Sequence, residues 1–238
     1  MESNGKSFLL TNIKNSLLFL LTMNFMIYII QFVNLIFIGL TINNIQGEIM
    51  IEQPNFYRLK MLIIVALFSG LIGVLAQISI PLPFNLVPIT GQTLAIGLAG
   101  TIIGSKHSTY ATILYVIMGA IGIPVFSNFK AGLSAILSPT GGFIIGFIPT
   151  AFVIGYIIER FSLKVSIAFI ANVIGMLITL FFGTVWYKFS MTVEWGVAFA
   201  STFYPFLLVG IIKAYMAANL GVLIRKRLLQ AKLIFHAQ

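Results

Sequence analysis

"MLIIVALFSGLIGVLAQISI", residues 61–80, is a mostly apolar run without a charged residue. A run of roughly 20 such residues can cross the hydrocarbon core of a bilayer as a helix. Five further apolar stretches follow it, at 86–104, 108–124, 139–158, 165–186 and 197–224. They lack the strict alternation of a barrel strand, and a helix satisfies its own backbone hydrogen bonds in lipid. The sequence therefore predicts an all-α integral membrane protein, a bundle of six transmembrane helices.

The composition supports this fold class and excludes several others. The chain has 238 residues, of which 59% are hydrophobic and 8% charged, whereas a soluble domain carries roughly a quarter charged residues. The net charge of +9 is spread over the ends of the predicted helices, so it does not indicate nucleic-acid binding. There is no cysteine, and the two histidines, His107 and His236, are far apart. We therefore expect no metal site and no cofactor.

The distribution of cations predicts the orientation of the six helices. If the chain crosses six times, only Lys130 and Lys188 lie on one side of the membrane. The other side receives nine cations: Arg58, Lys60, Lys106, Arg160, Lys164, Arg225, Lys226, Arg227 and Lys232. Because cytoplasmic loops carry the excess of Lys and Arg, both ends of the six-helix unit are expected in the cytoplasm. This is the pattern of a multi-pass protein of the plasma membrane.

The N-terminal 49 residues fit this scheme poorly. They contain a further apolar segment at 16–42, but a crossing there would put Lys6 and Lys14 outside, against the positive-inside rule. Residues 1–49 are therefore either an added anchor helix or an extension upstream of a natural start at Met50. We favour the extension, and place the membrane domain at 50–238.

Two loops predicted on the external side contain prolines, which make the backbone stiff, or glycines, which allow close backbone approach. "PLPFNLVP", residues 81–88, holds three prolines, which fix φ and predict a stiff extended loop. The loop between the third and fourth spans contains Lys130, Pro139 and the pair Gly141–Gly142. Irregular backbone at membrane depth is tolerated only where protein or a cavity surrounds it. The two loops are therefore predicted to cover a pocket.

Three stretches resemble the BioY family, the biotin-binding substrate-capture components of energy-coupling-factor (ECF) transporters. They are "VPITGQTLA" (87–95), "PVFSNFKAGLSAILSPTGGFIIGF" (124–147) and "GTVWY" (183–187) followed by "YPFLLVGIIKA" (204–214). The resemblance covers about residues 60–225. It implies a six-helix bundle that binds biotin near the external face and has no ATPase of its own. The implied partners are a transmembrane coupling subunit and two ATP-hydrolysing subunits.

Lys213 is the foremost candidate for contact with a ligand. It lies within the last apolar span, about a dozen residues before Arg225, and an ionisable residue at that depth marks a ligand or partner. The resemblance places Lys213 at the lysine of a D-x-x-K ligand motif. The acid of that motif is missing, because residue 210 is glycine. Either Asn128, Asn172 or Ser134 supplies an acceptor instead, or affinity is reduced, or the ligand is another small vitamin.

Biotin offers a carboxylate, a ureido ring and an apolar thioether ring, so its site needs a cation, polar partners and aromatic walls. Besides Lys213, the candidate ligand-binding residues are Lys130, Asn128, Gln92, Tyr204 and Phe143. A solvated charge for Lys130, and ordinary helix packing for Gln92 and the aromatic residues, are the structural alternatives.

Small residues on the first span predict a second kind of site. Ala66 and Gly70 are four residues apart, a spacing that lets another helix approach closely. The resemblance implies that this face docks on the coupling subunit; packing inside the bundle is the alternative.

The sequence lacks the residues that an enzyme, a channel or an ATPase would need. An intramembrane enzyme would need a nucleophile with a base, paired acids or a metal cluster, and the sequence offers none of these. A channel would need a repeated polar stripe or a ring of charges. There is also no phosphate-binding loop of the G-x-x-x-x-G-K-[ST] type, so energy for transport must come from partners.

Overall fold

A computed structural model describes residues 54–82 and 86–230 of the chain. Two of the sequence predictions fall outside these residues, namely the 1–49 extension with its apolar segment 16–42 and the assignment of Met50 as a start. The chain separates into two units, and the one from Arg58 to Gln238 holds the loops and the cavity discussed below.

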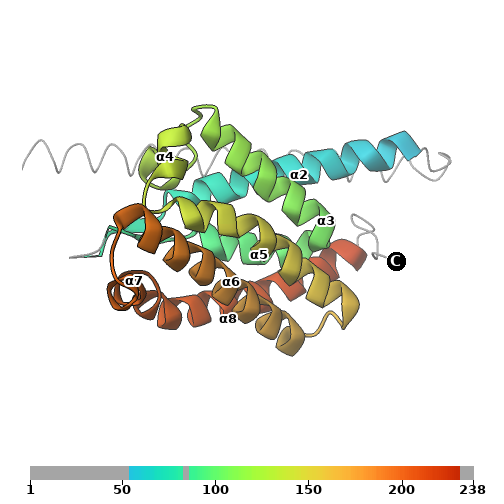
Figure 1. Cartoon of the computed structure of the whole chain (residues 1–238). Coiled ribbons are helices and arrows are strands. Elements are labelled where there is room, and N and C mark those ends of the chain that lie inside the picture. The colour runs from blue at the N-terminus through green and yellow to red at the C-terminus, as the bar shows by residue number, and fades with distance from the viewer. Residues whose placement is uncertain (1–53, 83–85, 231–238) are drawn as a thin grey trace, which may run out of the picture. The chain divides into compact units, whose positions relative to one another are not determined.

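The described residues form helices joined by short loops, with one small hairpin (Figure 1). The helices are α2 (Pro54–Ala76), α3 (Gln92–Ala120), α4 (Leu133–Leu137), α5 (Gly141–Arg160), α6 (Val165–Met191), α7 (Trp195–Thr202) and α8 (Tyr204–Gln230). A 3-10 turn covers Ser127–Phe129, and the two strands are β1 (Ser79–Ile80) and β2 (Ile89–Thr90).

The all-α membrane class is confirmed, whereas the number of crossings stays a prediction. Within the described residues, four helical stretches are long and apolar enough to cross a bilayer: Arg58–Ala76, Gly141–Arg160, Val165–Met191 and Trp195–Gln230. The predicted spans 86–104 and 108–124 fall largely on α3, which a break at Gly104 divides into two helical halves. The last predicted span begins in α7, which is followed directly by α8.

The break in α3 has a specific geometry. Gly104 has φ 78°, a left-handed value that favours glycine. A Cβ at this residue would overlap the carboxylate of Glu159 on α5. That carboxylate accepts a hydrogen bond from the backbone N–H of Ser105 at 2.9 Å, while Arg225 Nη1 donates to the carbonyl of Thr101 at 3.1 Å. At the break, the carboxylate of Glu159 thus caps the N-terminal end of the second half, and the guanidinium of Arg225 caps the C-terminal end of the first half. The helix dipole favours these two charges at these two ends.

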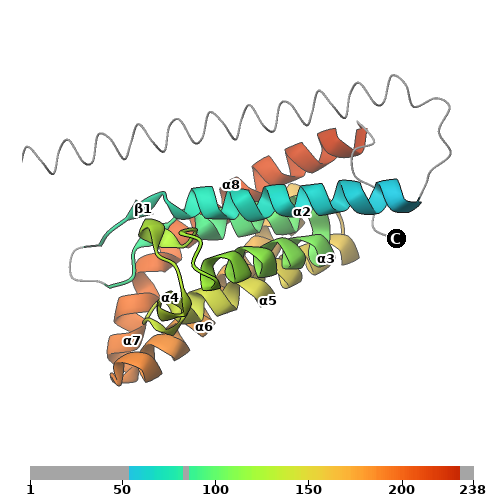
Figure 2. The same cartoon turned by 90° about the horizontal axis from the view of Figure 1, so that it is seen from above.

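Helices α3, α5, α6 and α8 form the packed centre: α3 lies against α5 and α8, and α6 lies against α5 and α8. Glycines allow this close approach. Gly155 of α5 faces the backbone of Ser105, and Gly175 of α6 faces Ile154. The hairpin, α4 and α7 gather at one end in both views (Figures 1 and 2), and the α5–α6 connection lies at the other.

The two loops that the sequence predicts to be rigid and external are joined to each other. The proline-rich loop is closed by the antiparallel pairing of Ser79 with Thr90. Gln77 fastens the second loop, because its Nε2 donates to the carbonyl of Phe126 at 3.1 Å and its Oε1 accepts from the N–H of Phe129 at 2.9 Å. The hydroxyls of Ser79 and Ser127 lie 3.3 Å apart. These bonds hold both loops over one end of the helices.

Candidate functional site

A cavity lies beneath the two loops. It is lined by residues of the hairpin, of the second loop and of helices α3, α5, α6 and α8, and it contains about 1070 Å³ of empty space, its open mouth included. Of the residues predicted from the sequence, Lys213, Lys130, Gln92 and Phe143 line this cavity, whereas Asn128 and Tyr204 do not.

Lys213 reaches the cavity from α8 and is held by uncharged groups. Its Nζ donates to the carbonyl of Thr90 at 2.7 Å and to Oγ1 of Thr93 at 3.3 Å. An ammonium group has three donors, so one N–H is left for a ligand. The bond to Thr90 also ties α8 to the hairpin across more than a hundred residues of sequence. Lys213 is therefore both a positioned cation and a fastening of the loop.

Gln92 begins α3 at the cavity, but protein partners occupy its side-chain amide. Its Oε1 accepts from the hydroxyl of Thr90 at 2.8 Å, and its Nε2 donates to the hydroxyl of Tyr115. Gln92 is buried and Tyr115 fully so. The amide therefore fixes Thr90, the residue whose carbonyl receives Lys213. The structure thus gives Gln92 a supporting role beside its predicted contact with the ligand.

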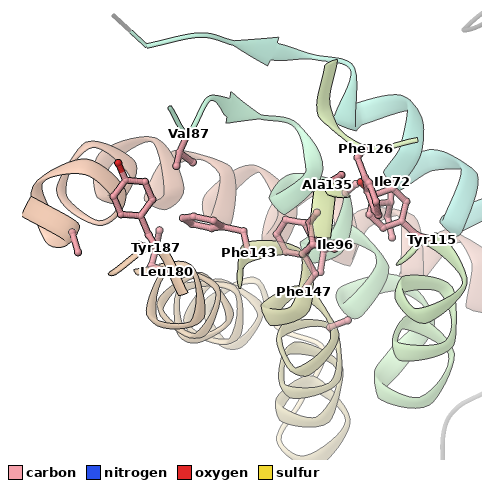
Figure 3. Close-up of a cluster of buried hydrophobic side chains, with 14 residues drawn as sticks. Ile72, Val87, Ile96, Tyr115, Phe126, Ala135, Phe143, Phe147, Leu180 and Tyr187 are labelled. Carbon is pink, nitrogen blue, oxygen red and sulfur yellow. The ribbon is translucent and has the colours of Figure 1, made fainter. Parts of the chain in front are cut away.

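Phe143, at the start of α5, forms part of an apolar wall. Figure 3 shows its ring among Val87, Ile96 and Tyr187, and it belongs to the main cluster of buried hydrophobic residues. Phe206 of α8 lies beside it with a ring-centroid distance of 6.2 Å and also lines the cavity. An apolar ring of a ligand would meet these aromatic faces.

The second loop brings one of its two predicted polar residues to the cavity. Lys130 is exposed and lies at the lining, and its backbone N–H donates to the carbonyl of Ser127 at 3.4 Å. Asn128 is exposed too, adopts φ 58°, and does not line the cavity. Lys130 can therefore meet a charged group at the mouth, while Asn128 faces elsewhere.

Tyr204 was the aromatic candidate on α8, and the structure places it outside the lining. Its side chain is 64% exposed and its ring contacts those of Phe199 and Phe203. Phe206, which sequence reasoning missed, lines the cavity instead. Helix geometry could have found it, because residues seven apart share a face, and Phe206 lies seven residues before Lys213.

Gly210 lies in the lining one turn from Lys213, and α6 fills the space beside it. A Cβ at residue 210 would overlap the sulfur of Met176, which also lines the cavity. Where an acid at residue 210 would place its side chain, a methionine from a neighbouring helix fills the space. The sequence gives no sign of this pairing.

The predicted docking residues Ala66 and Gly70 lie on an exposed face of α2. Within the described chain, no atom lies within 4 Å of the point where a Gly70 Cβ would stand. The adjacent face points inward: Ser69 and Ile72 are fully buried, and Gly73 faces Val125. This arrangement leaves the face of Ala66 and Gly70 available to another helix, and docking on a partner stays a prediction.

Across the described residues, no group of three or more His, Asp or Glu side chains is placed to hold a metal ion. The arrangement of one cation, neutral hydrogen-bonding groups and aromatic walls is suited to binding a small molecule.

Comparison with known proteins identifies relatives of this chain. The family model described as "BioY family" matches residues 49–230. The chain is 38% identical over 165 residues to "Biotin transporter BioY2" of Lactococcus lactis subsp. cremoris, covering 69% of this chain and 90% of that protein. It is 37% identical over 170 residues to "Biotin transporter BioY" of Thermotoga maritima, covering 71% and 97%.

A solved structure is similar as well. It is the crystal structure of the S-component for biotin from an ECF-type ABC transporter, with a TM-score of 0.68 and 26% sequence identity. The similarity covers 72% of this chain and 94% of that chain. The family consists of transporter components and not of enzymes. The match over residues 49–230 and the identity to full-length relatives show that this chain belongs to the BioY family.

Proposed function

We propose that the chain is the substrate-binding subunit of a biotin uptake transporter, which captures biotin at the external face of the membrane. The observation that carries this proposal is Lys213, a cation held inside a largely apolar cavity with one donor unused. The names of the relatives support biotin as the ligand over another small vitamin.

The chemistry of biotin suits the cavity. Its apolar thioether ring would contact Phe143 and Phe206. Its two polar ends, the carboxylate and the ureido carbonyl, both accept hydrogen bonds, and the two lysines of the lining donate them. A charge-assisted hydrogen bond in such a surrounding is stronger than a neutral one, so Lys213 is expected to contribute much of the affinity.

The proposal includes partners and a location. The chain would deliver biotin through an ECF module consisting of a transmembrane coupling subunit and two ATPase subunits, with Ala66 and Gly70 on the docking face. It would lie in the plasma membrane of a prokaryote, with both ends of the six-helix unit in the cytoplasm. Helix α2 offers small residues and open space on the proposed docking face.

Equilibrium binding of labelled biotin to the purified full-length protein tests the function. Wild type is expected to bind, and Lys213→Met to lose about 2 kcal/mol, or about thirtyfold in affinity. Lys226→Met, at an exposed position of the same helix, is the matched control and should bind like wild type. Absence of biotin binding by folded wild-type protein rejects the function. Equal affinity of Lys213→Met and wild type rejects the role of Lys213.

A further inference from the structure

Asn172 of α6 presents an acceptor to the inner part of the cavity. Its side chain lines the cavity and is 4% exposed. Its Nδ2 donates to Oγ1 of Thr101 at 3.1 Å and to the carbonyl of Ala168 at 2.8 Å. No donor among the described residues reaches its Oδ1. Among the described residues, Ser69 Oγ is the fully enclosed side-chain atom that lacks a partner, so Oδ1 of Asn172 is not fully enclosed. On one side this oxygen packs against Gly97 of α3. Because Asn172 lines the cavity, we take the cavity as the side on which Oδ1 is accessible.

The neighbouring hydrogen bonds fix which end of the amide carries the oxygen. The carbonyl of Ala168 can only accept, so it requires the amide nitrogen. The hydroxyl of Thr101 donates its single proton to the carbonyl of Gly97 at 2.7 Å, so it too can only accept from Asn172. A flipped amide would lose both bonds. The open atom is therefore an oxygen, and it is held in place.

Two threonines of the same lining also present acceptors. Thr150 donates its proton to the carbonyl of Gly175 at 3.1 Å. Thr179, whose hydroxyl lies 2.8 Å from that of Thr150, must therefore donate to Thr150. Both protons are then used inside the protein, and only lone pairs remain. The polar groups of α5 and α6 in the cavity thus match a ligand that donates hydrogen bonds.

Helix α8 supplies no such acceptor side chain. Its lining residues are Phe206, Val209, Gly210, Lys213 and Ala214, of which the lysine donates and the others are apolar. Asn128 and Ser134, the other acceptors considered from the sequence, are exposed and lie outside the lining. Asn172 is the one of these three candidates that reaches the cavity.

We propose that Asn172 determines specificity by accepting a hydrogen bond from a ring N–H of the ligand, which for biotin is a ureido N–H. This inference rests on the proposed function, since it identifies how the same cavity recognises biotin. Donation from Lys213 and acceptance by Asn172 would together select a ring that carries both a carbonyl and an N–H. A ligand without the N–H would leave a buried acceptor unpaired, which is a strong basis for discrimination.

The test compares the binding of two probes to the full-length protein. One is biotin, and the other is biotin methylated at both ureido nitrogens, which has no ureido N–H to donate. Asn172→Ala is expected to weaken biotin binding at least tenfold and to leave binding of the methylated probe almost unchanged. Asn219→Ala is the matched control, because Asn219 of α8 bonds to Tyr215 of its own helix and lies outside the cavity.

Three outcomes overturn the proposal while leaving the function intact. One is unchanged biotin affinity in Asn172→Ala. The second is an equal loss for both probes in Asn172→Ala, which would make Asn172 a packing residue. The third is a loss of biotin affinity in Asn219→Ala as large as in Asn172→Ala, which would make the effect unspecific. If Asn172→Ala is not recovered as folded protein, Asn172→Leu, closer in volume, takes its place with the same expectations. A wild-type protein that binds neither probe rejects the proposed function, and the role of Asn172 with it.

Discussion

Met176 of α6 stands against Gly210 of α8, in the space that a side chain at residue 210 would enter. Both residues line the cavity, and a Cβ on residue 210 would overlap the methionine sulfur. Methionine is flexible and fills irregular gaps. The side chain of Met176 thus occupies the space beside residue 210, where the resemblance to the BioY family implies an acid. This relationship decides how an acid can be restored.

We expect Gly210→Asp to tighten biotin binding only when the methionine is shortened as well. The single variant must displace Met176, so its gain is offset by strain. In the double variant Gly210→Asp with Met176→Ala, the carboxylate has room and lies one turn from Lys213 on the same helix face. Calorimetry should give tighter binding for the double variant than for Met176→Ala alone. Equal or weaker binding would show that an acid at residue 210 does not serve this ligand.

The membrane class and Lys213 could be predicted from the sequence because both depend on hydropathy. A lysine inside an apolar helix is conspicuous, and the structure places it in a cavity. The neighbours of Lys213 could not be predicted in the same way. Thr90 and Thr93 lie about 120 residues away along the chain, and only tertiary packing brings them to the ammonium group.

The partition of α3 shows a second limit of hydropathy. The apolar runs 86–104 and 108–124 predict two spans, and the break at Gly104 divides α3 into two helical halves close to the predicted boundary. The second half of the helix is capped by Glu159, which comes from another helix and accepts from the backbone N–H of Ser105. Hydropathy treats such an acid as the end of a span, so its role as a helix cap is invisible in the sequence. The prediction of Tyr204 as a lining residue is wrong for a simpler reason. Phe206 lines the cavity, and Tyr204 lies on a different face of α8.

We expect removal of residues 1–49 to leave biotin binding unchanged. The residues that line the cavity all belong to the unit from Arg58 to Gln238, and the family match begins at residue 49. The truncated protein should bind labelled biotin with wild-type affinity in detergent. If it inserts and remains monodisperse but no longer binds, the extension belongs to the binding unit.

Bulky residues on the exposed face of α2 should impair assembly and spare binding. Ala66→Leu with Gly70→Leu fills a face that is open in this chain, so copurification with the coupling subunit should fall while biotin affinity in detergent persists. Gly196→Leu on α7 is the matched control, because a side chain there also meets open space. A joint loss of binding and assembly would mean that Ala66 and Gly70 support the bundle itself.

Glu159→Gln should destabilise the protein through the break in α3. The carboxylate accepts from the backbone N–H and the hydroxyl of Ser105, at the start of the second half of the helix. A neutral amide keeps the shape but loses the charge that a helix N-terminus favours. The expected loss is about 1 kcal/mol, typical of a weakened cap, and thermal unfolding in detergent measures it.

The control for that measurement is Glu194→Gln. Glu194 precedes α7, and its side chain makes no capping hydrogen bond, so its replacement should change stability by less than about 0.5 kcal/mol. Gly104→Ala should be more damaging than Glu159→Gln, because the added Cβ meets both a left-handed backbone and the carboxylate itself. Equal unfolding temperatures for Glu159→Gln and wild type would show that the break is maintained by packing of Gly155 against Ser105 and not by the cap.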